Sequence, residues 1–310
     1  MCGIAGYIGK KKISKKNIFE TLNLMKNRGP DFQSHTSFSH NNFNISLLHS
    51  RLSIIDLDPR SNQPYIDNNC ILIFNGEIYN YLEIKKELIE SGVIFKTDSD
   101  TEVLIKSYQK FGEKCVEKLE GMWSFAIYDK IKNKFFLSRD RFAEKPLFYY
   151  KSSEGFYFAS ETKFLKKLVE NKFTINNKHL YRYLVNGHKS LYKTEETFYN
   201  GIKEVDFATN LSISNNKISQ YKYWKPSFSP TNINEKDAVE GIKYFLKKSL
   251  KLRLRSDVPL AFCLSGGVDS ASLVSLAAKE FNYNVSTFSI IDSDPRYNEL
   301  DNIESTVNDI

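Results

Sequence analysis

Cysteine occupies the second position of the chain, in the opening segment MCGIAGYIG. If Met1 is removed, Cys2 carries both a thiol and a free α-amine. A thiol is mostly protonated at neutral pH and benefits from a nearby base. An α-amine can be that base once its charge is disfavoured locally. On position alone, chance is the better explanation, so a nucleophile at Cys2 needs support from the rest of the sequence.

A second stretch with chemical potential is LSGGVDS, between a predicted strand and a predicted helix. Gly266 and Gly267 allow backbone amides to face a ligand, and the following helix adds its positive dipole end. Ser265 and Ser270 supply hydroxyl donors, and Asp269 is a candidate magnesium ligand. The alternative is an ordinary turn capped by Asp269. The string lacks the lysine of a Walker loop.

The elements that must position these residues differ along the chain. Residues 1–205 contain short apolar and aromatic runs typical of strands, with helices between some of them. Two helices are predicted from capping boxes, Asn80 with Glu83 and Ser99 with Glu102. The expected helix stops are Gly92 and Gly112.

The second part of the chain changes character. Residues 206–235 are rich in Asn, Ser and Pro and predict a hairpin followed by a linker. Residues 236–310 predict a helix and then a β-α-β unit with VPLAFCLS as a buried strand, which indicates a parallel sheet. Because one such unit cannot cover both faces of its sheet, we expect this domain to be truncated.

Composition narrows the function classes. The chain has 310 residues and a net charge of +7, with lysines scattered rather than clustered, which disfavours a nucleic-acid partner. No run is long enough to span a membrane, and no secretory signal is present, so a cytoplasmic enzyme is expected. The cysteines at 2, 70, 115 and 263 form no metal or disulfide pattern, and the last three are predicted to lie in the core.

Several motifs in a fixed order connect Cys2 to a known chemistry. The chain resembles the class II glutamine amidotransferases, which are N-terminal-nucleophile glutaminases. Its later SGGVDS resembles the pyrophosphate loop of ATP pyrophosphatases, and the combination resembles glutamine-hydrolysing asparagine synthetases. The resemblance covers residues 2–165 and about 236–300. The motifs of the first part are RGPD at 28–31, HSRLSIIDL at 49–57, FNGEIYN at 74–80, SDTE at 99–102 and RDRFAEKPL at 139–147.

This resemblance implies a fold and a domain division. It implies an α+β N-terminal-nucleophile hydrolase sandwich of αββα layers, followed by the start of an α/β parallel-sheet ATP-pyrophosphatase domain. The glutaminase domain is then expected at 2–205, the hairpin and linker at 206–235, and the N-terminal part of the synthetase domain at 236–310. A homodimer is a candidate assembly.

By resemblance, Cys2 attacks the side-chain amide of glutamine, and Asn75 with Gly76 forms the oxyanion hole. The alternative for Asn75-Gly76 is a hairpin turn, for which Asn-Gly is a strong signal. The segment EIYN and a capped helix follow this pair, which weakens the turn interpretation.

The other end of glutamine has its own expected partners. Arg51 would bind the α-carboxylate, although a surface arginine at a strand edge is the alternative. Glu77 and Asp100 would bind the α-ammonium, although an acid such as Asp100 also stabilises the first turn of a helix. A dyad of Cys2 with His49 is disfavoured, because the family uses the α-amine.

The second site would use ATP as co-substrate with Mg²⁺, and Asp269 would be a metal ligand. Aspartate would be adenylated and then amidated by ammonia that arrives through an internal tunnel. The products would be asparagine, glutamate, AMP and pyrophosphate. The resemblance places Leu264 and Ile290 at the nucleotide, and Ser265, Gly266, Gly267, Asp269 and Ser270 around the pyrophosphate.

Three alternatives remain. An enzyme of the same architecture could amidate another carboxylate, such as a sugar acid or an antibiotic precursor, and DPRYNE at 294–299 lies where acceptor specificity could diverge. A nucleic-acid modifier and a non-catalytic relic are both disfavoured by the intact glutaminase motifs. One departure is Ala143, where the family commonly has glycine. If this position requires a positive φ, alanine costs stability there.

Overall fold

The computed structural model describes residues 1–214, 217–294 and 296–310. They form two compact units, Met1–Ser227 and Phe228–Ile310. Asn215 and Asn216 of the predicted linker range, and Pro295 of DPRYNE, lie outside the described residues.

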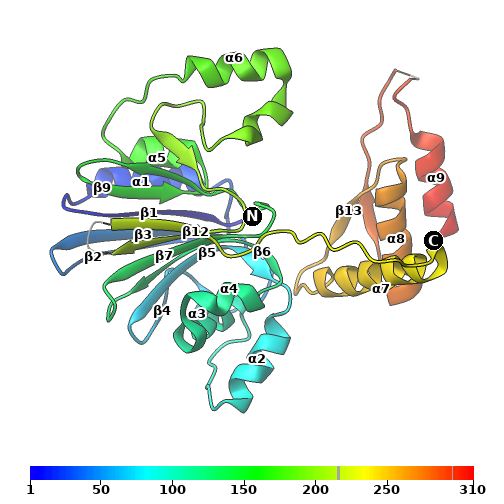
Figure 1. The fold of residues 1–310 in the computed structure, drawn as a ribbon, viewed down its shortest axis with the longest axis horizontal. Helices are drawn as coiled ribbons and strands as arrows, with labels where there is room; N and C mark the ends of the chain where they lie inside the picture. Colours follow the sequence, from blue (N-terminus) through cyan, green and yellow to red (C-terminus); the bar gives the residue numbers. More distant parts are fainter. Residues whose placement is uncertain (215–216, 295) are drawn as a thin grey trace. The chain divides into compact units, whose positions relative to one another are not determined.

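The first unit is built on two antiparallel sheets, each of six strands within the described residues (Figure 1). The first sheet has the order β10 (Ile202–Glu204), β8 (Phe148–Lys151), β9 (Gly155–Ala159), β1 (Gly3–Gly9), β3 (Phe43–Arg51) and β2 (Phe32–His40). The second has the order β12 (Lys217–Lys222), β11 (Thr209–Ser214), β7 (Lys134–Arg139), β6 (Gly121–Asp129), β5 (Cys70–Ile78) and β4 (Tyr65–Asp67).

Helices cover the outer faces of both sheets (Figure 1). On the first sheet lie α1 (Lys15–Met25) and α5 (Thr162–Leu168); on the second lie α2 (Tyr81–Glu90), α3 (Asp100–Phe111) and α4 (Cys115–Lys118). The other helical segments of this unit are η1 (Pro59–Ser61), η2 (Gly112–Lys114), α6 (Asn177–Asn186) and η3 (His188–Lys193). The expected αββα sandwich is therefore confirmed.

The apolar residues on both faces of β1 explain why this strand, which directly follows Cys2, lies at the centre of the sandwich. Ile4 and Ile8 face the core between the two sheets, whereas Ala5 and Tyr7 face the core under α1 and α5. A strand whose two faces are both covered needs apolar residues on both sides. Every residue of β1 is buried, which fixes the position of the residue that precedes it.

The helix boundaries were predicted better than the capping contacts. Asn80 precedes α2, but its side chain makes no capping bond; Oδ1 accepts from the Glu120 N–H at 2.8 Å and Nδ2 donates to Lys118 O at 2.9 Å. Ser99 does cap α3, accepting from Thr101 N–H at 3.0 Å. The Glu102 carboxylate accepts backbone N–H groups at Lys96 and Thr97 instead of returning to Ser99. Both capping boxes were therefore wrong in detail.

Left-handed backbone occurs at three of the positions singled out in the sequence. The predicted helix stops are confirmed, because Gly92 has a φ of 87° and Gly112 a φ of 62°. Ala143 has a φ of 56°, so the alanine occupies a conformation that favours glycine. Its carbonyl accepts a hydrogen bond from Arg139 Nη2 at 3.1 Å, which holds the strained loop against the end of β7.

The hairpin expected within 206–235 belongs to the first unit. It is formed by β11 and β12, and β11 also pairs with β7 of the second sheet. The hairpin is therefore part of the sandwich, and the first unit extends to Ser227. No helix among the described residues is long and apolar enough to cross a membrane.

The second unit contains α7 (Glu235–Arg253), β13 (Ala261–Cys263), α8 (Val268–Phe281), β14 (Ser286–Phe288) and α9 (Leu300–Asp309). Strands β13 and β14 pair in parallel, as predicted. The strand expected over VPLAFCLS is shorter and is not buried, and Cys263 is exposed rather than in the core. A sheet of two described strands buries little of its surface, which explains both corrections.

Candidate active site

Cys2 lies directly ahead of β1, with its thiol against the end of β3. Its Sγ accepts the Leu52 N–H at 3.4 Å and lies 3.5 Å from Leu52 O, so it is held between a donor and an acceptor. Burial raises the pKa of the Cys2 thiol, while the Leu52 hydrogen bond, the N-terminal ammonium and Arg51 oppose that rise. A buried thiol with a raised pKa needs a base nearby to become a nucleophile.

The chain terminus provides such a group at this place. Burial lowers the pKa of the Met1 α-ammonium, and the positive charges of Arg28 and Lys145 lower it further. The same surroundings would favour the neutral form of an α-amine on Cys2 after Met1 is removed. His49 is not placed as a base: burial lowers its pKa to about 3, and its Nε2 contacts Phe74 O at 3.0 Å.

Arg28, the first residue of RGPD, fixes the backbone of Cys2. Its Nε donates to Cys2 O at 2.9 Å, and its Nη1 donates to Glu161 Oε1 at 3.0 Å. The next residue, Gly29, has no room for a Cβ, which would lie 2.3 Å from the Ser50 carbonyl carbon. The sequence marked this motif through resemblance but assigned no role to Arg28.

Asn75 and Gly76 lie inside β5, opposite Ser124 and Trp123 of β6, so the hairpin-turn alternative is wrong. Asn75 is fully buried, yet its Oδ1 has no partner among the described residues, and its Nδ2 is 3.5 Å from Ser124 Oγ. A buried amide oxygen without a partner is costly in a folded protein. The side chain is therefore placed to pair with a group that enters the pocket.

Gly76 is required by the closeness of β6. A Cβ at this position would lie 2.1 Å from Met122 O and 2.7 Å from Trp123 Cα. Both of these atoms belong to the backbone of a central strand and cannot move away without breaking the sheet. The lack of a side chain here leaves the pocket side of β5 open to a ligand.

The two carboxyl groups of the pocket are both short of counter-charge. Burial raises the pKa of Asp100 to about 7. Two contacts oppose that rise, because Asp100 Oδ2 accepts the Ile78 N–H at 3.0 Å and the positive charge of Arg51 favours the carboxylate. Burial also raises the pKa of Glu77, with Lys145 opposing the rise. An added cation would stabilise both carboxylates.

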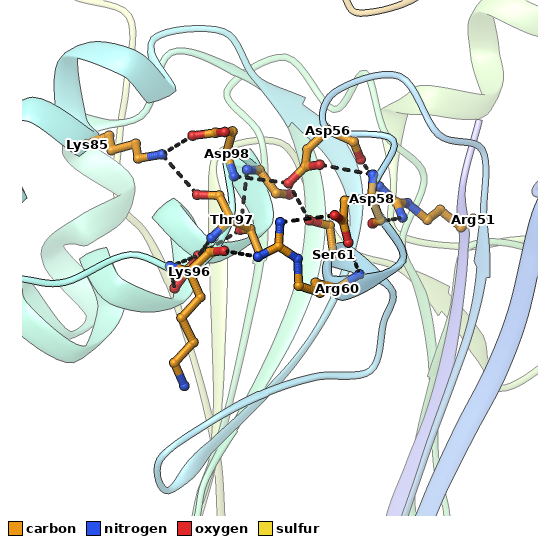
Figure 2. A network of polar contacts seen from close by, with 11 residues as sticks. Arg51, Asp56, Asp58, Arg60, Ser61, Lys85, Lys96, Thr97 and Asp98 are labelled. Atoms are coloured by element: carbon orange, nitrogen blue, oxygen red, sulfur yellow. Dashed lines mark hydrogen bonds and ion pairs between the residues drawn. The ribbon is translucent and has the colours of Figure 1, made fainter.

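Arg51 ends β3 and is held by the segment that follows it (Figure 2). Its Nη1 donates to Asp58 O at 3.1 Å and to Asn62 Oδ1 at 2.8 Å, and its Nη2 donates to Asp56 O. These bonds fix the plane of the guanidinium while it lines the pocket. A fixed guanidinium plane suits two-point binding of a carboxylate.

The glutaminase residues expected from the sequence share one pocket with a volume of about 40 Å³. Sequence reasoning missed several lining residues, among them Gln63 and Lys145. Gln63 Oε1 accepts the Phe74 N–H at 2.6 Å, while Lys145 is a buried lysine within the RDRFAEKPL motif. The RDRFAEKPL motif could have indicated Lys145 as a site residue, but no sequence pattern indicated Gln63. The predicted residues in this pocket are Cys2, Arg51, Asn75, Gly76, Glu77 and Asp100.

The SGGVDS loop lies between β13 and α8 of the second unit, as expected. Ser270 Oγ accepts the Ser265 N–H at 3.1 Å and donates within the loop, which closes the turn. The Gly266 N–H donates to Glu299 Oε2 at 3.1 Å, so a carboxylate lies at one of the amides expected to face an anion. Asp269 is exposed in the first turn of α8.

The two apolar residues expected at the nucleotide have different surroundings. Leu264 is buried in a small core with Val274 and Ile303, so only its backbone is available to a ligand. Ile290 is 98% exposed. Among the described residues no group of three or more His, Cys, Asp or Glu side chains could hold a metal ion.

Comparison with known proteins supports the resemblance. A family model for a glutamine amidotransferase domain matches residues 1–224, and one for asparagine synthase matches residues 241–310. Asparagine synthetases [glutamine-hydrolyzing] 1 and 3 of Bacillus subtilis are 34% and 32% identical to this chain over 99% and 91% of its length. The chain covers 48% and 46% of them, so it spans about half the length of these curated relatives.

A solved structure agrees on the fold. The glutamine phosphoribosylpyrophosphate amidotransferase from B. subtilis has a TM-score of 0.51 and 16% identity, covering 92% of this chain and 65% of that one. At this identity the likeness concerns the fold alone. The sandwich, the pocket behind the N-terminus and the sequence matches lead to one conclusion: the chain belongs to the glutamine amidotransferase domain family, with an asparagine synthase domain beginning at residue 241.

Proposed function

We propose that this chain contains the glutaminase site and the first part of the synthetase site of a cytoplasmic, glutamine-dependent asparagine synthetase. Cys2 hydrolyses glutamine, and the released ammonia attacks an aspartyl-adenylate made from ATP and aspartate. The products are asparagine, glutamate, AMP and pyrophosphate. The single observation that carries the proposal is the shared pocket, to which residues from positions 2 to 100 contribute.

In the first step, Cys2 Sγ attacks the side-chain amide carbon of glutamine and an S–C bond forms. The thiol proton passes to the α-amine of processed Cys2, because burial and the positive charges of Arg28 and Lys145 lower the pKa of the terminal amine at this place. That proton then moves to the leaving nitrogen, the C–N bond breaks, and ammonia departs. Water hydrolyses the remaining γ-glutamyl thioester to glutamate.

Negative charge develops on the amide oxygen during the attack. The Gly76 N–H and Asn75 Nδ2 would donate to it from β5, a contribution typically worth about 2.7–4 kcal/mol for each donor. The unpartnered Asn75 Oδ1 supports this role, because a half-turn of the amide exchanges its two polar atoms and would bring Nδ2 to the same position.

The α-carbon of glutamine carries the groups that set its orientation. Arg51 would bind the carboxylate through a guanidinium plane already fixed by its own loop. Asp100 and Glu77, both with raised pKa values, would gain the counter-charge of the α-ammonium. Recognition of both groups selects an amino acid over a simple amide.

The second site would bind ATP with its phosphates at the SGGVDS loop. Mg²⁺ usually binds through one or two carboxylates together with substrate phosphates, and Asp269 would supply one carboxylate. Magnesium would neutralise phosphate charge there. Ser265, Ser270 and the loop amides would donate to the phosphates, after the Gly266 N–H exchanges Glu299 for a phosphate oxygen.

The test is glutamate release by the full-length protein carrying Cys2→Ala. We expect hydrolysis to fall to the background rate, whereas amidation with added ammonium and ATP continues. Cys263→Ser is the matched control, because this cysteine is exposed in the second unit and should leave hydrolysis unchanged. Glutamine hydrolysis that survives in Cys2→Ala would overturn the assignment.

The acceptor is tested separately with the same full-length protein. Candidate carboxylates, including aspartate and sugar acids, are supplied with ATP and glutamine, and AMP and pyrophosphate are followed. We expect aspartate to give the largest stimulation. If another carboxylate stimulates AMP and pyrophosphate release more strongly, the protein is instead an amidotransferase of the same architecture that acts on that carboxylate.

A further inference from the structure

We propose that Asp56 is a positioning residue for glutamine, because one side chain ties the loop that holds Arg51 to the segment that leads into Asp100. This inference rests on the proposed glutaminase function. Asp56 does not line the pocket and so acts through its neighbours. It lies in the segment between β3 and η1, which the sequence marked only as part of HSRLSIIDL.

The backbone of Asp56 contacts Arg51 directly (Figure 2). Its carbonyl accepts from Arg51 Nη2, in a residue whose φ of 54° lies in the left-handed region. Asp, Asn and Gly adopt this conformation more readily than other residues. The choice of residue at this position is therefore limited by the backbone before any side-chain contact is considered.

The carboxylate of Asp56 contacts both the loop that holds Arg51 and the segment that leads into Asp100. Oδ1 accepts the Asp58 N–H at 3.0 Å, which shapes the loop that holds Arg51. Oδ2 accepts the Ser61 hydroxyl at 2.7 Å and the Asp98 N–H at 3.0 Å. Figure 2 shows these bonds meeting at one side chain. The link to Asp98 spans 42 positions of the sequence.

Asp98 stands two residues before Asp100, the first residue of α3. Its segment is also held from the far side, where Lys85 Nζ donates to Asp98 Oδ1 at 2.6 Å and to Thr97 O at 2.9 Å. Arg60 adds a parallel connection from the loop, donating to Lys96 O at 2.9 Å. The start of α3 is thus fixed relative to the Arg51 loop.

The spacing matters because the carboxylate and the ammonium of glutamine sit on one carbon atom. Three of the five N–H donors of Arg51 bond to the loop, which leaves two for the substrate. If the loop shifts, the remaining donors shift with it, while Asp100 stays with α3. The pocket would then bind one group of glutamine well and the other poorly.

Asp56→Asn is the sharpest probe of this arrangement. Asparagine keeps the size and the left-handed backbone, but an amide has one oxygen and one N–H₂ group. The single amide oxygen can accept either from the Asp58 N–H or from the Asp98 N–H and the Ser61 hydroxyl. One of these two groups of donors therefore loses its partner. Asp206→Asn is the matched control, because Asp206 does not line the pocket and its carboxylate contacts the Phe207 N–H at 2.8 Å and Lys222 Nζ at 2.8 Å.

The experiment measures glutamate release by the full-length protein across glutamine concentrations. For Asp56→Asn we expect KM to rise about tenfold, as for loss of one charge-assisted hydrogen bond, with kcat changed less than about threefold. Ser61→Ala removes one donor only and should raise KM less. Asp206→Asn should match the wild type within about twofold.

A double-mutant cycle separates positioning from general stability. Arg51→Lys removes the planar group on which Asp56 acts, so adding Asp56→Asn to it should raise KM by less than about twofold. Equal KM for wild type and Asp56→Asn, or a full additive effect on top of Arg51→Lys, would overturn the role of Asp56. A wild type that does not hydrolyse glutamine would instead refute the proposed function itself.

Discussion

The pocket at Cys2 and the loop at SGGVDS are built in opposite ways. The pocket gathers side chains from both sheets and from α3, and hydrogen bonds between distant positions hold them. The loop uses consecutive residues that bond to one another and to Glu299. The chemistry of the pocket is therefore set by the whole fold, whereas that of the loop is set by its local sequence.

A pair of glycines tests this difference most strongly. Gly76→Ala would bring a Cβ within 2.1 Å of the Met122 carbonyl, and we expect it to cost about 3 kcal/mol or more of stability. Gly267→Ala meets only a flexible hydroxyl, Ser265 Oγ, at 3.3 Å, and should cost less than about 1 kcal/mol. Chemical denaturation of both variants measures the two values. Equal losses would contradict the contrast between a rigid and a local site.

The proposed oxyanion role of Asn75 predicts the next largest effect. We expect Asn75→Ala to lower kcat for glutamine hydrolysis by about 10²–10³, because one donor to the developing charge is lost. Ser124→Ala, which removes the hydroxyl 3.5 Å from Asn75 Nδ2, is the control and should retain most activity. If KM rises and kcat stays constant in Asn75→Ala, the residue binds the ground state instead.

Acid should weaken the first unit through His49. Its pKa falls from 6.5 to about 3 on burial, so the unfolded chain binds more protons than the folded one between these values. The stability from His49 is fully present above pH 6.5 and declines by about 1.4 kcal/mol per pH unit below it. Urea denaturation at pH 7 and pH 5 should show that acid lowers the stability of the wild type relative to that of His49→Leu. The same change with pH in both proteins would show that His49 is not buried in its neutral form.

The smallest expected effect is an increase in stability, for Ala143→Gly. Ala143 has a φ of 56°, and Ala143→Gly would relieve this strain but add freedom to the unfolded chain. The net result should be a stabilisation of about 0.5–1 kcal/mol in thermal or chemical denaturation. A loss of stability would mean that the methyl group packs usefully in this loop.

Local patterns predicted the strand-rich first part and the parallel β-α-β unit, whereas the αββα layering was expected from the resemblance to the class II glutamine amidotransferases. It also named the pocket residues, since the glutaminase motifs mark them one by one. What it could not predict are contacts made by tertiary structure. Asn80 finds partners 38 and 40 positions away instead of capping its own helix. Asp56 gave no local signal for its bond to the Asp98 N–H.

The cysteines predicted to lie in the core also show that tertiary contacts cannot be predicted from local sequence. Cys70 and Cys115 are buried as expected, because sheet and helix layers cover them. Cys263 sits in an equally apolar run but is exposed, since burial depends on which other segments pack over a strand. Residue type indicates a preference for the core, and only the fold decides whether the preference is met.

The central place of β1 has a consequence for the timing of synthesis. This strand pairs with β3 on one side and with β9 on the other, and the β9 partners extend to Ala159. Until β9 is made, β1 is the edge strand of a three-stranded sheet of β1, β3 and β2. At about 5–20 residues per second the ribosome needs on the order of 10 s to reach that point. During this interval β1 has an unpaired edge, and we expect removal of Met1, which the proposed function requires, to take place before β9 pairs with it.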